Sequence, residues 1–270
     1  MNTVSPDLSD RLQFAVDIAR QAGEVTLKYF QQDNYEVDLK ADNSPVTIAD
    51  QQAEQLLRNQ IAARFPADGI IGEEYGKTEG SNDYCWVLDP IDGTKSFISG
   101  VPLYGTLVGV LHQRQGVVGV IFMPGLDEMI YAGQGQGAWY QRGTSEPQPA
   151  RVSTRRSLQD AVVVTTQIDS FAKRQAQQAF HDLEKGARIT RTWGDCYGYL
   201  LVATGRADIM IDPIMNIWDA AAIQPILEEA GGTFTDWQGV PSIHQGEGVG
   251  TNGHLLEAAL KITATYPGPS

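Results

Sequence analysis

Two aspartates stand at the end of an apolar run, in the segment Asp89-Pro90-Ile91-Asp92-Gly93-Thr94. Two further segments with acidic residues accompany them, Gly72-Glu73-Glu74 upstream and Trp218-Asp219 downstream. Carboxylate and carbonyl oxygens are the ligands that Mg²⁺ prefers, usually together with water and substrate phosphate oxygens. Because a proline separates Asp89 from Asp92, the chain turns there and both side chains can face one cleft. The pattern therefore predicts a metal centre that acts on a phosphate ester.

The acidic residues of each segment also have an ordinary structural explanation. Asp-Pro and Asp-Gly are common turn dipeptides, and Glu73-Glu74 could form a solvated acidic turn. Asp50 could serve only as the capping-box partner of Thr47, and Asp219 could be an acid favoured by the dipole at a helix start. The order strand, Asp-Pro-Ile-Asp-Gly-Thr, helix is more specific than either dipeptide. It also places the backbone N–H groups of Gly93-Thr94 where a helix start can bind phosphate oxygens.

Hydrophobic spacing predicts the elements that must hold these residues in the first half. Ser5-Pro6-Asp7 has the form of a helix start with a capping serine, and apolar residues at helical spacing follow as far as Ala22. A second helix is predicted from Thr47, because Thr47-Ile48-Ala49-Asp50 fits a capping box with Asp in place of Glu. The strands predicted next are 85–88, 106–112, 117–123, 129–132 and 138–140, with a hairpin turn at 113–116. The first half is thus expected to be a mostly antiparallel sheet flanked by helices.

The second half alternates between the two kinds of element. The pattern predicts strand 162–166, helix 170–185, strand 189–192, helix 197–204, strand 209–211 and helix 220–230. Alternation of this kind favours an α/β layered arrangement. The segment 143–150, which contains Pro147 and Pro149, is the predicted junction between the halves. We therefore expect an N-terminal half, 1–148, with most of the metal ligands and a C-terminal half, 149–270, with the specificity residues and Asp219.

Composition narrows the class of protein. The 270 residues carry a formal net charge of -13, which disfavours nucleic acid or an anionic membrane as a partner. Bound cations would suit that charge, and they would also overcome its repulsion of a phosphate ester. The two cysteines, Cys85 and Cys196, have no spacing typical of a disulfide framework or a zinc site, which favours a reduced, cytoplasmic setting. The N-terminus has no signal-peptide pattern and no apolar run is long enough for a membrane span, so a soluble protein is expected.

Taken together, three motifs resemble the signatures of the inositol monophosphatase family, over nearly the whole chain. They are Asp89-Pro90-Ile91-Asp92-Gly93-Thr94, Gly72-Glu73-Glu74 and Trp218-Asp219-x-Ala221-Ala222-x5-Glu228-x-Ala230-Gly231-Gly232. The resemblance implies an α/β (α+β) fold, a five-layer αβαβα sandwich of the inositol monophosphatase / fructose-1,6-bisphosphatase type. It further implies a lithium-sensitive, Mg²⁺-dependent phosphomonoesterase, commonly a homodimer, with about two or three Mg²⁺ ions at each site.

The same resemblance implies a set of metal ligands. Glu73, Asp89 and the carbonyl of Ile91 match the ligands of the first metal ion. Asp89, Asp92 and Asp219 match those of the second. Two metal ions in such a site activate a water for in-line attack on phosphorus and stabilise the leaving alkoxide.

Catalytic roles follow from the resemblance in the same way. Thr94, paired with Asp50, matches the threonine that helps to orient and activate the attacking water, and the Gly93-Thr94 backbone matches the phosphate cradle. Lys40 lies, loosely, where family members carry a lysine near the active-site loop, here 40–45. The four histidines show no metal-binding spacing and are assigned no catalytic part.

Residues in the C-terminal half of the chain are expected to recognise the substrate. The segments 191–199 and 212–219 resemble the histidinol-phosphate phosphatase branch of the family more closely than the inositol branch, which typically has small uncharged residues where Gly194-Asp195-Cys196 stands. Histidinol phosphate carries an ammonium group and an imidazole, so Asp195 and Asp212 could pair with its cationic end. Asp92 and Arg191 are predicted as further substrate contacts, and Glu74 is a weaker candidate. Asp195 could equally cap the helix predicted near residue 197, and Asp212-Pro213 could be a strand-ending turn.

The function implied is hydrolysis of L-histidinol phosphate to L-histidinol and phosphate, in histidine biosynthesis. An inositol-1-monophosphatase or a broad-specificity sugar-phosphate phosphatase is the alternative enzyme. A non-catalytic, cation-binding regulatory module is the alternative from another class. The presence of both Thr94 and Asp50 disfavours that module, since a simple metal binder has no need to activate water.

Overall fold

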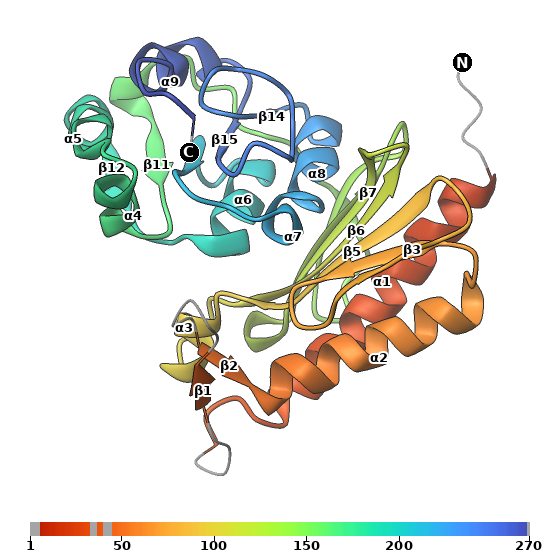
Figure 1. The fold of residues 1–270 in the computed structure, drawn as a ribbon. Helices are drawn as coiled ribbons and strands as arrows, with labels where there is room; N and C mark the ends of the chain where they lie inside the picture. Colours follow the sequence, from red (N-terminus) through yellow and green to blue (C-terminus); the bar gives the residue numbers. More distant parts are fainter. Residues whose placement is uncertain (1–5, 33–36, 40–44, 269–270) are drawn as a thin grey trace.

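In the computed structural model, which describes residues 6–32, 37–39 and 45–268, helices and sheets alternate in five layers (Figure 1). The helices are α1 (Pro6–Leu27), α2 (Ile48–Arg64), α3 (Thr94–Ile98), α4 (Ile168–Lys173), α5 (Gln177–Gly186), α6 (Asp195–Ala203), α7 (Ile217–Ala220), α8 (Ile223–Glu229) and α9 (Leu256–Thr263). The strands of the first half are β1 (Val37–Leu39), β2 (Pro45–Thr47), β3 (Gly69–Gly72), β4 (Gly76–Thr78), β5 (Tyr84–Asp92), β6 (Gly105–His112), β7 (Gln115–Met123), β8 (Glu128–Gly133), β9 (Gly137–Arg142) and β10 (Gln148–Pro149). Those of the second half are β11 (Val162–Val164), β12 (Ile189–Arg191), β13 (Ile209–Asp212), β14 (Thr233–Thr235) and β15 (Gly248–Thr251).

The first sheet has eight strands in the order β10-β9-β8-β7-β6-β5-β3-β4. All of its neighbouring pairs are antiparallel except β3 with β5, which confirms the mostly antiparallel sheet predicted from the sequence. The predicted hairpin joins β6 to β7, and Gln113 and Arg114 at its tip have φ of 51° and 69°. Two positive φ values are typical of a type I′ hairpin turn. The short strands β3 and β4 were not predicted, and β10 continues this sheet to residue 149.

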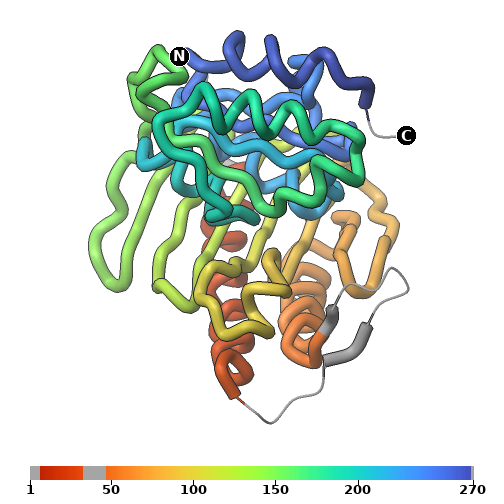
Figure 2. The backbone as a smooth tube through the Cα atoms, turned by 90° about the vertical axis from the view of Figure 1, so that its left-hand side faces the viewer, coloured from red at the N-terminus to blue at the C-terminus, as the bar shows by residue number. Residues whose placement is uncertain are grey.

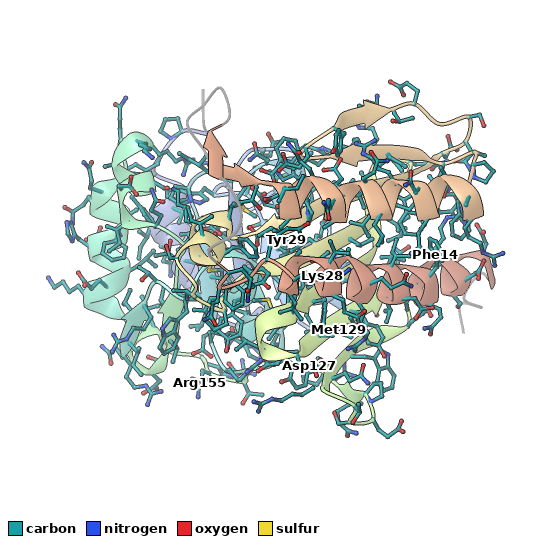
Figure 3. All side chains as sticks on the ribbon, turned by 90° about the horizontal axis from the view of Figure 1, so that it is seen from below. Phe14, Lys28, Tyr29, Asp127, Met129 and Arg155 are labelled. Atoms are coloured by element: carbon teal, nitrogen blue, oxygen red, sulfur yellow. The ribbon has the colours of Figure 1, made fainter. Side chains whose placement is uncertain are left out.

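Helices α1 and α2 cover one face of this sheet. The apolar residues predicted to face inward on α1, Leu12, Ala15 and Ala19 among them, are buried against Trp86 and Leu88 of β5. Helix α2 begins with the predicted capping box between Thr47 and Asp50. Seen from below, the two helices lie side by side across the sheet, with Phe14 on α1 and Tyr29 just beyond its end (Figure 3). The Ser5 cap of α1 lies outside the described residues.

The second sheet has the order β12-β11-β13-β15-β14. Its first three strands are parallel, in agreement with the predicted alternation of strands and helices, whereas β15 pairs antiparallel with both β13 and β14. Helices α4, α5 and α9 cover its outer face through one apolar cluster (Figures 1 and 2). No helix within the described ranges is both long enough and apolar enough to span a bilayer. Both cysteines are free, as expected.

One predicted helix, 170–185, is wrong, because the chain forms α4 and α5 with a turn between them. Gln175 in that turn has a φ of 59°. The preceding residue, Arg174, is drawn inward: its guanidinium lies 3.6 Å from the Trp237 ring centroid and pairs with Glu247. These partners come from distant parts of the chain, so helical spacing alone could not reveal the break.

Helices α6, α7 and α8 form the middle layer between the two sheets (Figure 1). The predicted helix 220–230 is the pair α7 and α8, which starts earlier and is interrupted at Ala221 and Ala222. That interruption lies on a pair of glycines, Gly109 of β6 and Gly119 of β7, which are directly opposite in the sheet. A Cβ on Gly119 would stand 1.9 Å from the carbonyl oxygen of Ala222, so backbone packs directly on backbone. This contact fixes α7, and with it Asp219, over the first sheet.

Gly119→Ala is therefore expected to lower the free energy of unfolding by about 1–3 kcal/mol, since the neighbour that must move is backbone and not a flexible side chain. Thermal or urea unfolding measures the change. Gly268→Ala is the matched control, because a Cβ there meets no atom within 4 Å. Equal stability of the two variants would contradict this account of the middle layer.

Candidate active site

The carboxylates of Asp89 and Asp92 lie on the same face of β5 because the strand is irregular between them. Along β5, Trp86 and Leu88 pack towards α1 and α2, whereas Val87 packs towards the middle layer. Residues three apart in a regular strand would point to opposite faces. The register shifts between Asp89 and Asp92, which pair with Leu107 and Gly105, so one extra residue is accommodated. Such a bulge is also a place where a strand tolerates proline, here Pro90.

Asp219 joins these two aspartates from the middle layer. It is the third residue of α7, and its Oδ2 accepts a hydrogen bond of 2.7 Å from the backbone N–H of Asn216 in a capping box. The helix-start explanation of Asp219 is thus correct but incomplete. One carboxylate oxygen each from Asp89, Asp92 and Asp219 lies within 4.8 Å of the others.

The turn after β3 brings Glu73 to the same place. Glu54 of α2 is fully buried, and its carboxylate accepts the backbone N–H groups of Glu74 and Tyr75 at 2.7 and 3.2 Å. The N–H of Glu73 itself donates to the carbonyl of Leu88 on β5 at 3.2 Å. Its side chain lies close enough to Asp89 to raise the pKa of that carboxyl group. Glu54 was not predicted as a site residue, although it lies one helical turn from Asp50 on the same helix.

These carboxylates disfavour one another's charge. Burial, followed by the charges of Glu73, Asp92 and Asp219, raises the pKa of Asp89 well above its ordinary value. Burial, followed by Asp195 and Asp219, does the same for the pKa of Asp92. Burial raises the pKa of Asp219 to about 7. The donors are all oxygens, which are the ligands of Mg²⁺ and Ca²⁺ rather than of zinc or copper, so the cluster fits a hard divalent cation.

Asp50 and Thr94 lie beside this cluster, and their side chains bond to other residues: Asp50 to its predicted capping-box partner Thr47, and Thr94 to Ile91. The Asp50 Oδ2 accepts from both the N–H and the hydroxyl of Thr47, each at 2.7 Å. The Thr94 hydroxyl donates to the carbonyl of Ile91 at 3.1 Å. The Asp50 Oδ1 is buried and has no hydrogen-bond partner among the described residues. Burial raises the pKa of Asp50 to about 6, with a further contribution from the charge of Glu73.

The segment after Asp92 forms a short helix start, as predicted. Gly93 is the N-cap of α3 and has a φ of 89°, a conformation that glycine adopts without strain. Its carbonyl accepts from the N–H of Phe97, which closes the first turn. The first N–H groups of a helix have no partner within the helix, which is the property on which the predicted phosphate cradle at Gly93-Thr94 depends.

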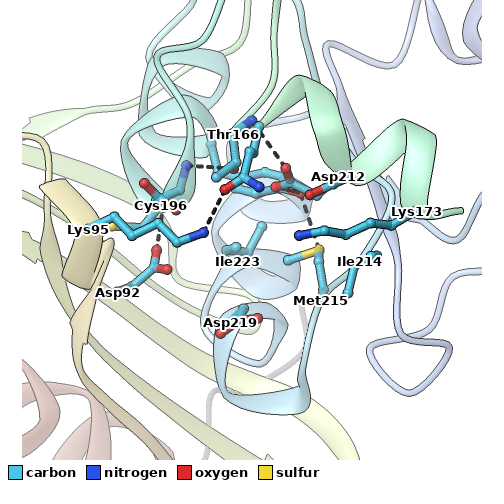
Figure 4. A pocket seen from close by; sticks show the side chains of 14 residues that line it. Asp92, Lys95, Thr166, Lys173, Cys196, Asp212, Ile214, Met215, Asp219 and Ile223 are labelled. Atoms are coloured by element: carbon cyan, nitrogen blue, oxygen red, sulfur yellow. Dashed lines mark hydrogen bonds between the residues drawn. The ribbon is translucent and has the colours of Figure 1, made fainter. Parts of the chain in front are cut away.

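A cavity of about 240 Å³ opens next to Asp92 and Asp219 (Figure 4). Two of the predicted substrate residues, Asp195 and Asp212, also line it. Asp212 is 5% exposed, and its carboxylate accepts from the backbone N–H of Thr166 at 3.3 Å and from the Tyr199 hydroxyl at 3.0 Å. Burial raises the pKa of Asp212 to about 6, and burial together with the charge of Asp212 raises that of Asp195 to about 7.

Two other predicted residues, Arg191 and Glu74, lie elsewhere. Arg191 is exposed on β12, donates to the carbonyl of Thr190 at 2.8 Å and does not line the cavity. Glu74 does not line it either, because it belongs to the turn held by Glu54. Lys40 and most of the loop 40–45 lie outside the described residues.

The cavity is also lined by residues that were not predicted from the sequence. Lys95 and Lys173 enter it from opposite sides (Figure 4). Lys95 directly follows the Gly93-Thr94 motif, so its position was a usable signal, and its ammonium group bonds to Gln167 at 2.6 Å. Lys173 and Thr166 come from the second sheet and its outer layer, and nothing in their local sequence marks them.

Comparison with known proteins agrees with this arrangement. Residues 7–266 match the model of the inositol monophosphatase family. The histidinol-phosphatase of Chlorobaculum parvum is 42% identical over 246 residues, which cover 91% of this chain and 92% of that relative. The histidinol-phosphatase of Streptomyces coelicolor is 34% identical over 94% of this chain and 97% of its own length. Among solved structures, an inositol monophosphatase from Zymomonas mobilis has a TM-score of 0.83 and 32% identity, with 97% of this chain and 100% of that chain covered.

The raised pKa values lead to a stability test. Because the pKa of Asp219 is raised from its ordinary value of 3.8 to about 7 in the folded protein, the metal-free folded state binds more protons than the unfolded state between these pH values. The contribution of Asp219 to the free energy of unfolding is therefore lost as the pH rises through that window. A divalent cation that pairs with the carboxylates should raise the unfolding temperature more at pH 8 than at pH 5.5, by about 2–4 °C for each kcal/mol of added stability.

Calorimetry with EDTA or with Mg²⁺ at each pH, at matched ionic strength in NaCl, measures this difference. An equal increment at both pH values would contradict a cation held by these carboxylates. Asp219→Asn should shrink the pH difference.

Proposed function

Because the chain belongs to the inositol monophosphatase family, we propose that it is a metal-dependent phosphatase that hydrolyses L-histidinol phosphate to L-histidinol and phosphate. The observation that carries the substrate is the presence of Asp195 and Asp212 in the same cavity as Asp92 and Asp219. A phosphate ester bound at the aspartate cluster would direct its alcohol portion towards these two carboxylates. The relatives named histidinol-phosphatase support the same substrate.

The metal ion proposed is Mg²⁺, held by Glu73, Asp89, Asp92, Asp219 and the Ile91 carbonyl. When bound, such ions offset the charge of the phosphoryl oxygens and lower the pKa of water. The Ile91 carbonyl accepts from Thr94, and a carbonyl oxygen has a second lone pair that can still serve a cation. The number of ions, proposed as two or three, follows from the family resemblance.

The chain's own residues supply the proton chemistry. The Asp50 Oδ1 has no partner among the described residues, and a carboxyl group with a pKa of about 6 is suited to accept a proton near neutral pH. Thr94 orients its hydroxyl along the Ile91 carbonyl and so lies next to the metal ligands. Pairing of Thr94 with Asp50 through the attacking water is part of this proposal.

The leaving alcohol would be recognised by charge. Histidinol carries an ammonium group, and a hydrogen bond to a charged partner contributes about 1.5–3 kcal/mol. No described residue donates a hydrogen bond to the Asp195 carboxylate, which leaves it available, whereas Asp212 is held by Tyr199 and Thr166. Ile214, Met215 and Ile223 give the cavity an apolar part that can accommodate a ring.

The two halves would then divide the work. We propose that residues 1–148 carry most metal ligands and that residues 149–270 carry Asp219 and the specificity residues. Membership of histidine biosynthesis, sensitivity to lithium, a homodimeric state and a cytoplasmic location stay predictions.

Asp89→Asn tests the metal centre. It should lower kcat/KM by more than about 100-fold, the largest loss typical of changing only an outer-shell partner of a metal ligand. The fold should persist, because the substitution removes one of several mutually repelling carboxylates. Phosphate release measures turnover and circular dichroism measures folding. The control is Asp160→Asn, an exposed carboxylate that precedes β11. An active Asp89→Asn enzyme would refute the assignment.

A panel of esters tests the substrate. Histidinol phosphate should be turned over with a higher kcat/KM than inositol 1-phosphate, fructose 1,6-bisphosphate or adenosine 3′,5′-bisphosphate. Asp195→Asn should raise the KM for histidinol phosphate about 10- to 100-fold more than that for inositol 1-phosphate. Asparagine is chosen because Asp195 has a φ of 49°, which Asn tolerates and Ala does not. Equal losses on both esters would remove the charge argument, and a preference for inositol 1-phosphate would favour the alternative enzyme.

A further inference from the structure

Thr166 contacts both residues that we assign to the substrate's cationic end, the carboxylate of Asp212 and the backbone of Asp195. It follows β11, and its backbone N–H donates to the Asp212 Oδ1 at 3.3 Å. Its hydroxyl oxygen accepts from the backbone N–H of Asp195 at 2.8 Å. Figure 4 shows Thr166 next to Asp212, on the side of the cavity away from Asp219. One residue thus connects the ends of β11 and β13 with the start of α6, through its backbone N–H and its hydroxyl.

Asp195 is a residue that needs such support. Its φ of 49° lies in the left-handed region, which is unfavourable for a residue with a side chain. A conformation of this kind persists only where the surrounding contacts hold it. Two hydrogen bonds do so at the start of α6: Asp195 donates to Thr166, and Cys196 donates from its backbone N–H to the Asp92 carboxylate. Without the Thr166 hydroxyl, one of the two is lost.

The two carboxylates share a cavity and repel each other: beyond the effect of burial, the charge of Asp212 raises the pKa of Asp195, whereas the charge of Lys95 lowers it. A segment that can relax will move Asp195 away from Asp212. The Thr166 hydroxyl opposes that movement, because it ties the backbone of Asp195 to a residue whose own N–H is bonded to Asp212. The two carboxylates are thereby kept together on one wall of the cavity.

We infer that Thr166 is a positioning residue that sets the enzyme's discrimination between phosphate esters of cationic and of uncharged alcohols. It acts through its hydroxyl on the backbone of Asp195, and it is not itself a catalytic residue. The inference rests on the proposed function, since it assigns Asp195 and Asp212 to the cationic end of the substrate.

Thr166→Val removes the hydroxyl and keeps the shape of the side chain and the backbone N–H. It should raise the KM for histidinol phosphate about tenfold more than the KM for inositol 1-phosphate. Thr166→Ser, which retains the hydroxyl, should restore the wild-type ratio. If the valine variant does not fold, as judged by thermal unfolding, Thr166→Ala removes the same group. An unchanged ratio, or a ratio that serine fails to restore, would overturn the inference.

Thr165 offers a matched control in the adjacent residue. Its hydroxyl is buried and has no hydrogen-bond partner among the described residues, and it does not line the cavity. Thr165→Val should therefore leave the ratio of the two KM values at the wild-type level. A shift equal to that of Thr166→Val would mean that any change after β11 has this effect, and would overturn the role of the Thr166 hydroxyl.

A second measurement separates this inference from the proposed function. L-Histidinol has the cationic end and lacks the phosphate, so it should inhibit hydrolysis of inositol 1-phosphate, with an inhibition constant about tenfold higher in Thr166→Val than in wild type. If wild type hydrolyses histidinol phosphate poorly but shows this pattern of inhibition, the proposed substrate is wrong and the role of Thr166 stands. If the inhibition constants are equal, the role of Thr166 is wrong whatever the substrate.

Discussion

Repulsion among buried carboxylates is the constraint on which the rest of this structure depends. Three carboxylate oxygens within 4.8 Å of one another would move apart unless the backbone held them. Three separate structural features hold these carboxylates in place. A bulge turns Asp92 to the face of Asp89, a capping box holds Asp219, and the buried carboxylate of Glu54 fixes the turn that carries Glu73. Each of the three involves the backbone: the bulge lies in a strand ladder, and the carboxylates of Asp219 and Glu54 accept hydrogen bonds from backbone N–H groups.

The aspartate cluster and the cavity are also coupled through one helix. The first N–H groups of α6 donate to Thr166 and to Asp92, so the start of this helix contacts both the cavity wall and the metal ligands. The favourable field at a helix N-terminus stabilises the negative charge of Asp92. A substrate that binds across Asp92 and Asp195 would therefore meet a single rigid unit. Under the proposed function, this unit would select for the charge of an alcohol several bonds from phosphorus.

Much of the site could be predicted because most of its acidic residues lie in short sequence motifs. Asp89, Asp92 and Asp219 were found from residue type and spacing, and the structure brings them together. The five layers followed from the family resemblance and not from hydrophobic periodicity. What failed were features set by distant contacts. The break between α4 and α5 depends on Trp237, and the place of Arg191 on an exposed strand depends on where β12 lies in the sheet. The structural role of Glu54 was missed because an acid on a helix is usually solvated.

The glycine pair in the first sheet has a consequence for how such an enzyme can diversify. Because Ala222, in the turn between α7 and α8, packs on Gly119 of β7 through backbone atoms, no side chain separates the two at that contact. Replacements elsewhere in α8 or in the second sheet can alter the shape of the cavity without moving Asp219 relative to Asp89. Substitutions near Asp195 and Asp212 would thus leave the positions of Asp89 and Asp219 unchanged. One scaffold can acquire new substrates by exchanging residues such as Asp195 while its chemistry is inherited intact.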